Sequence, residues 1–271
     1  MSLRINLNLA ALNAQRQLQA TDNALSASIE KLSSGFRINR AADDPAGLAI
    51  SEGLRAQVSG LAQAISNSSD AVNMIQTAEG ALSEVHSLLR TMRNLAVHAA
   101  NTGVNDTTAL TADQTQITSA LAALDRIATN TQFGTKVLLD GTATGLVFQV
   151  GANANQTISV DIGSCKATDL SISTIDVTTD AQSAITALDT AIGTVSTLRS
   201  GLGATQQSLA SNIATLGVAK ENIAASESSI RDTDMAAEMV RFTRNQILLQ
   251  AGVAMLTQAN AAPQALLQLL R

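Results

Sequence analysis

The chain has 271 residues, enough for one or two domains, and 17 basic against 22 acidic residues give it a formal net charge of -5. This acidic balance argues against a nucleic-acid partner, because nucleic acids are bound by basic surfaces. Trp and Tyr are absent and only four Phe occur, so a ligand pocket with aromatic walls is not expected.

Charged residues make up 14% of the chain, against roughly 25% in ordinary soluble domains. A weakly charged surface is normal where copies pack against one another. No run of 18 apolar residues occurs, so membrane insertion is not expected. The N-terminus has no basic region followed by an apolar stretch, so a cleaved secretory signal is not expected. The single Cys165 has no partner for an intrachain disulfide, and the sequence does not indicate its role.

The first predicted helix covers residues 1–34. Leu18, Leu25 and Leu32 recur at a spacing of seven, with Ile29 beside them, which is typical of one coiled-coil seam. Residues 33–44 read as a connector. Asp44 is a suitable N-cap and Pro45 suits the first helical position, so a second helix is predicted to begin there.

This second helix, over about 46–100, has the strongest periodicity in the chain. Two heptad positions stay apolar for about four heptads, so we expect a coiled-coil-like packing face. The residues predicted to form its core are Ile75, Leu82, Val85, Leu89 and Met92. A polar turn at 101–106 and a third helix with Leu110, Ile117 and Leu124 at heptad spacing follow.

Between about 135 and 180 the period changes from that of helix to that of strand. Residues 146–151 and 157–163 alternate apolar and polar side chains and are bounded by Gly and Asn, which predicts an antiparallel β-hairpin near 135–165. Residues 166–181 read as a loop rich in Thr and Asp.

From residue 182 the helical pattern returns. Leu202, Leu209, Leu216 and Ile223 stand seven apart, so this helix can pack back on the 46–100 helix. Asp232-Thr233-Asp234 interrupts it. A last helix carries the remaining apolar residues of the C-terminal end, namely Leu249, Val253, Leu256, Leu266, Leu267 and Leu270. The predicted fold is mainly α: a long helical bundle built from both halves of the chain.

No catalytic or metal-binding group is apparent. His86 and His98 are twelve residues apart on one helix and project about 120° apart, so they cannot share a metal ion. The acid pairs at 43–44 and 232–234 lie where helices begin or break, which capping explains. We therefore predict a protein that is not an enzyme and has no cofactor; a secreted hydrolase would need a nucleophile–base or metal group that the sequence lacks.

Several segments resemble bacterial flagellin in the family's order, over about 1–140 and 185–271. The segments that carry the resemblance are Arg37-Ile38-Asn39, Ala42-Asp43-Asp44, Thr77-Ala78-Glu79-Gly80-Ala81-Leu82, Gln132-Phe133, Leu198-Arg199-Ser200-Gly201-Leu202-Gly203-Ala204, Ile247-Leu248-Leu249-Gln250-Ala251-Gly252 and Gln258-Ala259-Asn260. The resemblance implies a filament subunit of the bacterial flagellum that lacks the outer variable domains of longer family members.

The resemblance also implies a division of the chain. Residues 1–34 and 235–271 would form a terminal coiled-coil domain at the filament core, 35–44 and 231–234 its connectors, and 45–230 a helical rod with the β insert. It implies export through the flagellar type III apparatus to the extracellular filament. The implied partners are other subunits, an export chaperone, the filament cap and the hook-junction proteins.

One family feature differs here. Many flagellins carry a Gln-Arg-Val-Arg-Glu-Leu stretch that Toll-like receptor five engages, and the corresponding residues are 90–95 of this chain. Arg93 and Leu95 are kept, but Thr91 and Asn94 replace the other Arg and the Glu, and Gln116 replaces a further acidic contact. Charge-assisted hydrogen bonds contribute about 1.5–3 kcal/mol each, so this resemblance implies weakened receptor activation.

The alternative assignment is the flagellin-like hook–filament junction protein, a short adaptor with the same terminal pattern. Indefinite self-polymerisation distinguishes the two. Because an amphipathic helix without a partner is marginal in water, we expect both chain ends to be disordered in the free subunit and to order on assembly.

Overall fold

The computed structural model describes residues 7–269, with side chains up to Ala261, and places nine helices and strands within them. Contacts divide the chain into two units: one runs up to Ala56 and resumes at Asn222, and the other covers Gln57–Glu221. The helices α2 (Pro45–Ala99) and α4 (Ala181–Arg231) contribute residues to both units. The first turns of α2 and the last turns of α4 group with the terminal helices in this division.

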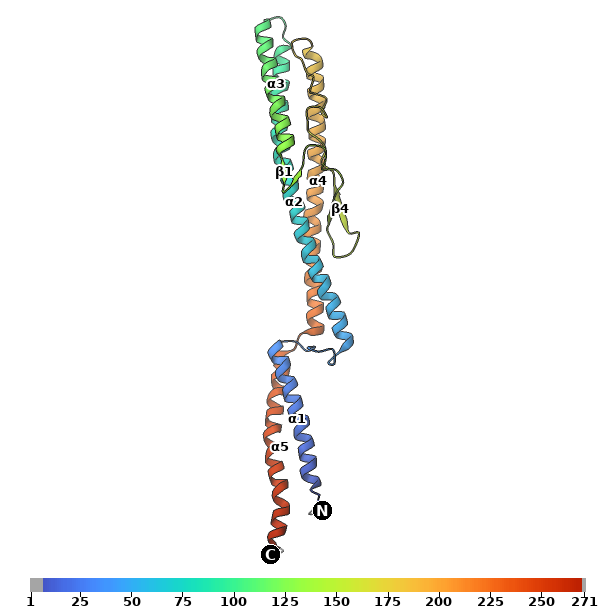
Figure 1. Cartoon of the computed structure of the whole chain (residues 1–271), viewed down its shortest axis with the longest axis vertical. Coiled ribbons are helices and arrows are strands. Elements are labelled where there is room, and N and C mark those ends of the chain that lie inside the picture. Colours follow the sequence, from blue (N-terminus) through green and yellow to red (C-terminus); the bar gives the residue numbers. More distant parts are fainter. Residues whose placement is uncertain (1–6, 270–271) are drawn as a thin grey trace. The chain divides into compact units, whose positions relative to one another are not determined.

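In the first unit, α1 (Leu9–Ser34) and α5 (Met235–Leu269) lie side by side (Figure 1). The Asn8 side chain caps α1 by accepting from Ala11 N at 3.1 Å, and its amide donates to the carbonyl of Ala259 on α5 at 2.8 Å. Gly35 ends α1 with φ of 76°, a left-handed conformation that glycine adopts without strain. Asp234 caps α5 through the N–H groups of Ala236 and Ala237.

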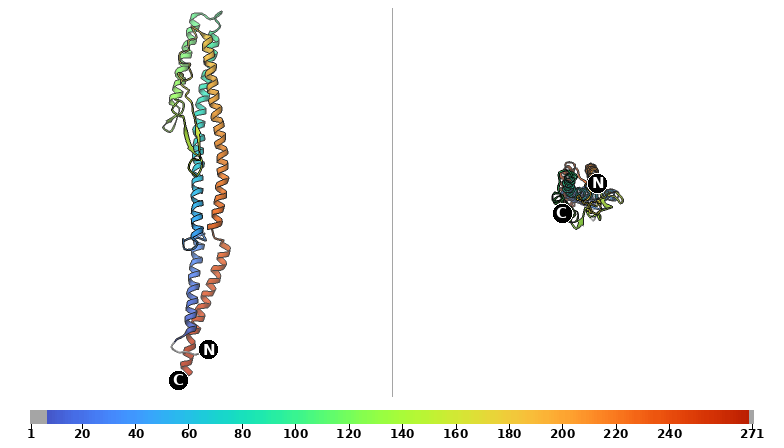
Figure 2. Two further views of the ribbon diagram at one scale, coloured as in Figure 1. Left: turned by 90° about the vertical axis from the view of Figure 1, so that its right-hand side faces the viewer. Right: turned by 90° about the horizontal axis from the view of Figure 1, so that it is seen from above.

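The second unit packs α2, α3 (Thr107–Asn130) and α4 side by side, as two views show (Figure 2). Asp44 accepts from Gly47 N at 2.9 Å, so α2 begins at Pro45 as the sequence predicts. Five predicted core residues of α2 have no exposed surface: Ile75, Leu82, Val85, Leu89 and Met92.

On α4, Leu202 and Leu209 are also buried in the core of the second unit. Leu216 retains 9% exposure and Ile223 is half-buried. Ile223 lies outside the rod core in which it was expected. Nearer the core, the Asn212 amide donates to the Val150 carbonyl of the hairpin loop at 3.1 Å.

The β region holds two antiparallel hairpins. The predicted one pairs β3 (Leu146–Gln149) with β4 (Thr157–Val160), and Val147 faces Ser159 across it. A shorter one pairs β1 (Gln132–Phe133) with β2 (Lys136–Val137). The fold is mainly α with a small antiparallel β element, which confirms the predicted class.

The segment after β4, predicted as a loop rich in Thr and Asp, covers the helices. Its apolar side chains are buried in the core of the second unit: Ala167, Leu170, Ile172, Ile175 and Val177. The Gln114 side chain on α3 holds this segment by donating to the Ile175 carbonyl at 3.0 Å and accepting from Val177 N at 2.9 Å. Buried backbone groups are thereby paired although the segment has no regular structure.

Candidate functional site

The α1–α5 pair has a regular seam. Buried or half-buried positions spaced alternately three and four residues apart run along α1: Ala11, Ala14, Leu18, Thr21, Leu25, Ser28 and Leu32. The same alternation runs along α5: Glu238, Phe242, Asn245, Leu249, Gly252, Leu256 and Ala259. The two stripes form a coiled-coil interface within one chain.

Small residues let the two helices approach closely. A Cβ added at Gly252 would lie 2.9 Å from Cδ1 of Leu18, so Leu18 fills the space that the glycine leaves. Thr21 is 7% exposed in the same seam, and its hydroxyl donates to the Gln17 carbonyl within α1. Of the predicted assembly residues, the seam contains Leu18, Leu25, Leu32, Leu249 and Leu256.

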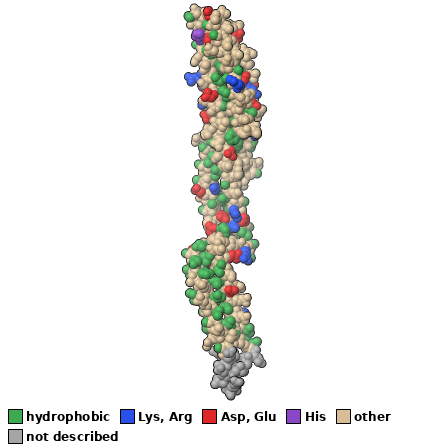
Figure 3. Space-filling view, turned by 60° about the vertical axis from the view of Figure 1, so that its left-hand side comes forward, with side chains coloured by type: hydrophobic (Ala, Val, Ile, Leu, Met, Phe, Trp, Pro, Cys, Tyr) green, Lys and Arg blue, Asp and Glu red, His purple; other side chains and the backbone are tan. Residues whose placement is uncertain are grey.

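Two other predicted assembly residues lie outside this seam. Ile29 is 50% exposed and Val253 is 48% exposed. They belong to a larger set of exposed apolar residues on the same two helices and just before α1. The remaining members are Leu7, Leu9 and Leu12 at the start of the chain, and Met235, Met239, Val240, Ile247, Leu248 and Met255 on α5. The space-filling view shows hydrophobic side chains gathered on this part of the surface (Figure 3).

Apolar residues project from several sides of α5. At about 100° per residue, Ile247 and Val240 project roughly opposite the seam, while Leu249 projects into it. After Arg244, the sequence of α5 contains no charged residue up to Leu269. A helix that is apolar on opposite faces is typical of a buried position, and α1 covers only one of those faces.

The predicted residues Leu266, Leu267 and Leu270 lie outside the described side chains. The apolar surface defined by Ile29 and the exposed α5 residues named above is hereafter the assembly face.

The residues expected to contact the receptor lie on two sides of α2 and on the neighbouring α3. His98 Nδ1 lies 2.7 Å from Asp113 Oδ2 on α3. Because α2 and α3 are antiparallel here, Leu95 and Gln116 lie about one turn from this pair, and Thr91 lies one turn further. Arg93 projects away from them toward α4, where its Nε lies 2.5 Å from Asp189 Oδ1.

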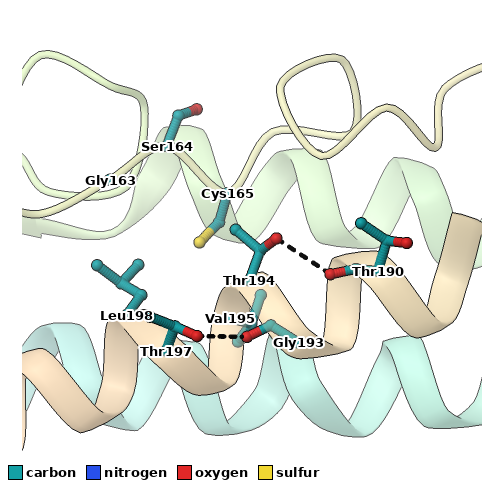
Figure 4. Close-up of a pocket in the computed structure, with 9 residues that line it drawn as sticks. All are labelled: Gly163, Ser164, Cys165, Thr190, Gly193, Thr194, Val195, Thr197 and Leu198. Atoms are coloured by element: carbon teal, nitrogen blue, oxygen red, sulfur yellow. Dashed lines mark hydrogen bonds between the residues drawn. The ribbon is translucent and has the colours of Figure 1, made fainter.

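Cys165 lines a groove of about 590 Å³ against α4 (Figure 4). Burial raises the pKa of its thiol to about 11. The nearby hydroxyls of Thr194 and Thr197 donate to the carbonyls of Thr190 and Gly193, which leaves them bonded within α4. The residues that line this groove include no histidine, lysine or carboxylate, and the Ser164 hydroxyl donates to the Asp169 carboxylate beside it.

Within residues 7–269, no cluster of three or more His, Cys, Asp or Glu residues is arranged to hold a metal ion. None of the described helices combines the length and hydropathy needed to cross a membrane.

The chain matches the bacterial flagellin N-terminal helical region over residues 5–144 and the C-terminal helical region over residues 185–270. The chain belongs to the flagellin family. It is 50% identical to a flagellin of Halalkalibacterium halodurans, with 98% of this chain and 99% of the relative covered. It is 46% identical to a flagellin of Bacillus subtilis, with 99% and 100% covered.

Among solved structures, flagellin of Bacillus cereus matches with a TM-score of 0.51 and 26% identity, over 56% of this chain and 88% of that one. A putative flagellar hook-associated protein of Vibrio parahaemolyticus matches with a TM-score of 0.59 over 70% of this chain and 100% of that one. Its identity of 15% shows a shared fold alone. The full-length relatives are flagellins, so the assignment as filament subunit is confirmed and the junction-protein alternative is not favoured.

The chain is therefore a structural subunit that polymerises into the flagellar filament. Flagellin is a structural protein family, which agrees with the prediction that the chain is not an enzyme.

Proposed function

We propose that the assembly face is the surface through which copies of this flagellin pack in the core of the filament. The observation that carries the proposal is the exposure of apolar side chains on the face of α5 opposite its seam. Exposed fractions of 61% for Ile247 and 68% for Val240 are unfavourable for a subunit that stays in water. A heterologous contact that does not close generates an open helical filament, and apolar helices that meet side to side supply its free energy.

The role in the cell follows from membership of the family. We propose that the subunit is secreted by the flagellar export apparatus and serves swimming motility in the extracellular filament. Its partners are further flagellin subunits together with an export chaperone, the filament cap and the hook-junction proteins. Membership of the family and the match to full-length flagellins support these partners.

A charge placed on the assembly face tests the proposal. Ile247→Asp puts a carboxylate opposite the seam, and Asn23→Asp, at an exposed position of α1 on the same side as Arg16, Gln19 and Glu30, is the matched control outside the assembly face. We expect Ile247→Asp to raise the critical concentration for polymerisation at least about tenfold, because burying an unpaired carboxylate is costly. Sedimentation of assembled protein measures the critical concentration, and electron microscopy identifies the filaments. Equal critical concentrations for the two variants would show that this face is not buried in the filament.

For Toll-like receptor five, we propose weakened activation. The supporting observation is that Arg93, the arginine retained from the receptor-binding stretch, is engaged by Asp189 of the same chain. Binding a receptor carboxylate would require Arg93 to leave this pair. Thr91 and Gln116 offer no charge to compensate.

A reporter-cell assay with monomeric protein tests this. The wild type should be less potent than a flagellin with the full charged stretch, and Thr91→Arg with Asn94→Glu should restore part of the potency. Ser66→Arg, a charge added at an exposed position of α2 that is 25 residues from Thr91, is the control. A wild type as potent as the reference flagellin would contradict the proposal.

A further inference from the structure

The two connectors of the first unit form a short two-stranded joint, defined here as residues 35–37 and 231–233. Phe36 and Asp232 pair as an isolated antiparallel bridge. Arg37 N donates to the Arg231 carbonyl at 2.6 Å, and Thr233 N donates to the Gly35 carbonyl at 2.9 Å. The backbone at the end of α1 is thereby bonded to the backbone at the start of α5, although about 200 residues separate them in sequence.

Two arginine side chains make contacts at this joint: the Arg37 guanidinium donates to the Ile230 carbonyl, and Arg231 makes a second set. Its guanidinium carbon lies 4.6 Å from the centroid of the Phe36 ring, within the range of a cation–π interaction. Its Nη1 lies 2.9 Å from Glu52 on α2. The Arg231 side chain is only 13% exposed, whereas that of Glu52 is 51% exposed, so the arginine is the part of these contacts that is shielded from water.

The same guanidinium is incompletely bonded. Its Nε is buried and has no hydrogen-bond partner among the described residues. Water would satisfy this donor if the side chain were free, so the buried position is imposed by the ring and the carboxylate. An arginine that formed only a surface ion pair would keep its Nε exposed to water.

Arg55 on α2 offers a direct comparison. Its Nη1 lies 3.7 Å from the same Glu52, but its side chain is 64% exposed and touches no aromatic ring in the described structure. Surface pairs of this kind contribute about 0–1 kcal/mol. Both arginines lie near Glu52, but only Arg231 stacks on Phe36 and is buried at the connector.

We propose that Arg231 holds the joint closed and thereby fixes where the α1–α5 pair begins. Helix α1 ends at Ser34 and α5 begins at Met235, so a closed joint sets the first turns of both helices beside each other. The costly step in forming a helix pair from distant segments is bringing the ends together, and the remaining heptads follow from that start. Arg231 is a positioning residue for the seam and makes no contact in the assembly face.

The experiment compares full-length Arg231→Ala, Arg231→Lys and Phe36→Leu with Arg55→Ala as the matched control. This experiment rests on the proposed function, because one of its readouts is the critical concentration for polymerisation. Arg231→Ala should raise that concentration about tenfold, and Arg55→Ala should leave it within about twofold. Arg231→Lys should fall between them, because lysine keeps the charge but not the planar stack.

A second readout follows amide exchange in the assembled filaments. Arg231→Ala should lose protection at residues 35–37 and 231–233 and in the adjoining turns of α1 and α5, while residues 71–99 of α2 stay protected. If Arg231→Ala instead fails to polymerise at all, that result supports the proposal equally, provided that the thermal transition of its second unit is unchanged and Arg55→Ala polymerises normally.

The double variant Phe36→Leu with Arg231→Ala separates stacking from general damage. If the two side chains act through one contact, the combined effect is smaller than the sum of the single effects. Additive effects, or an Arg231→Ala variant that matches Arg55→Ala, would overturn the proposal. If the wild type itself failed to polymerise, the proposed assembly would be wrong. The role of Arg231 would then be overturned independently if the wild-type monomer protected residues 35–37 and 231–233 from exchange and Arg231→Ala left that protection unchanged.

Discussion

Arg93 on α2 and Asp189 on α4 form a two-point ion pair, with Nε 2.5 Å from Oδ1 and Nη2 3.3 Å from Oδ2. The hydrogen bond from Arg93 is the main cause that holds the pKa of the Asp189 carboxyl below its ordinary value of 3.8. The pair joins two helices that meet through the fold and not through neighbouring sequence.

This lowered pKa predicts a pH-dependent contribution to stability. A carboxyl whose folded pKa is below its unfolded value stabilises the fold above pH 3.8, and the contribution is lost as the pH falls through the folded pKa. Asp189→Asn should therefore lower the free energy of unfolding at pH 7, and this loss should be smaller at about pH 3, below the ordinary pKa of 3.8. Urea titrations at both values measure this, with Asp70→Asn, an exposed position on α2, as control. An equal loss at both pH values would rule out the ionised carboxylate as the cause.

A glycine in α4 should be replaceable with a gain in stability. A Cβ added at Gly201 would meet no atom within 4 Å, so alanine fits without strain. Gly201→Ala should raise the free energy of unfolding by about 0.5–1 kcal/mol, because alanine loses less conformational freedom in a helix. Thermal unfolding of the subunit checks this.

Gly151→Ala is the opposing control for that measurement. Its added Cβ would lie 2.7 Å from Cβ of Gln156, so this variant should be destabilised. If both Gly201→Ala and Gly151→Ala raised the free energy of unfolding, local packing would not explain the effect of replacing glycine on stability.

Two asparagines should determine how firmly the β3–β4 hairpin is held. The amide of Asn67 on α2 donates to the Gln149 carbonyl at 3.1 Å, and that of Asn212 on α4 donates to the Val150 carbonyl at the same distance. Each alanine substitution should cost about 1 kcal/mol and increase amide exchange at residues 149–156. Asn94→Ala, at an exposed position of α2, should leave that exchange unchanged. Unaltered exchange in both hairpin variants would contradict the role of these bonds.

The thiol of Cys165 should be protected while the subunit is folded. It is buried, and its pKa of about 11 leaves roughly one thiolate in a thousand at pH 8. Maleimide labelling should be at least about a hundredfold slower in the native protein than in urea. Thr168→Cys in a Cys165→Ser background places a thiol at an exposed neighbour and should react quickly when folded. Fast labelling of native Cys165 would contradict its burial.

The periodic part of the fold was predictable because its core is built from large aliphatic residues at fixed spacing. Leu82 and Leu89 stand seven apart, and both are fully buried. The second hairpin was not predictable, since strands of two residues are too short for alternation to be seen. Burial of Ile172 was hidden for a related reason: it lies in a segment with neither a helical nor a strand period.

The seam of α5 could be predicted only in part. Because this helix is apolar on several faces, its periodicity did not separate Leu249, which lies in the seam, from Val253, which does not. Gly252 belongs to the seam although its residue type gives no hydrophobic signal. Contacts such as Arg231 with Phe36 join residues nearly 200 positions apart, and no local pattern marks them.

The Asn8–Ala259 hydrogen bond and the joint lie at the two ends of the described α1–α5 seam. The number of residues between these two attachments is therefore matched in the two helices. Removing seven residues from each helix would keep both attachments aligned, because every seam position would be replaced by its equivalent. Removing four residues from one helix alone would turn polar side chains into the seam. Natural variation in length is thus expected to avoid these helices and to accumulate in the connections of the second unit.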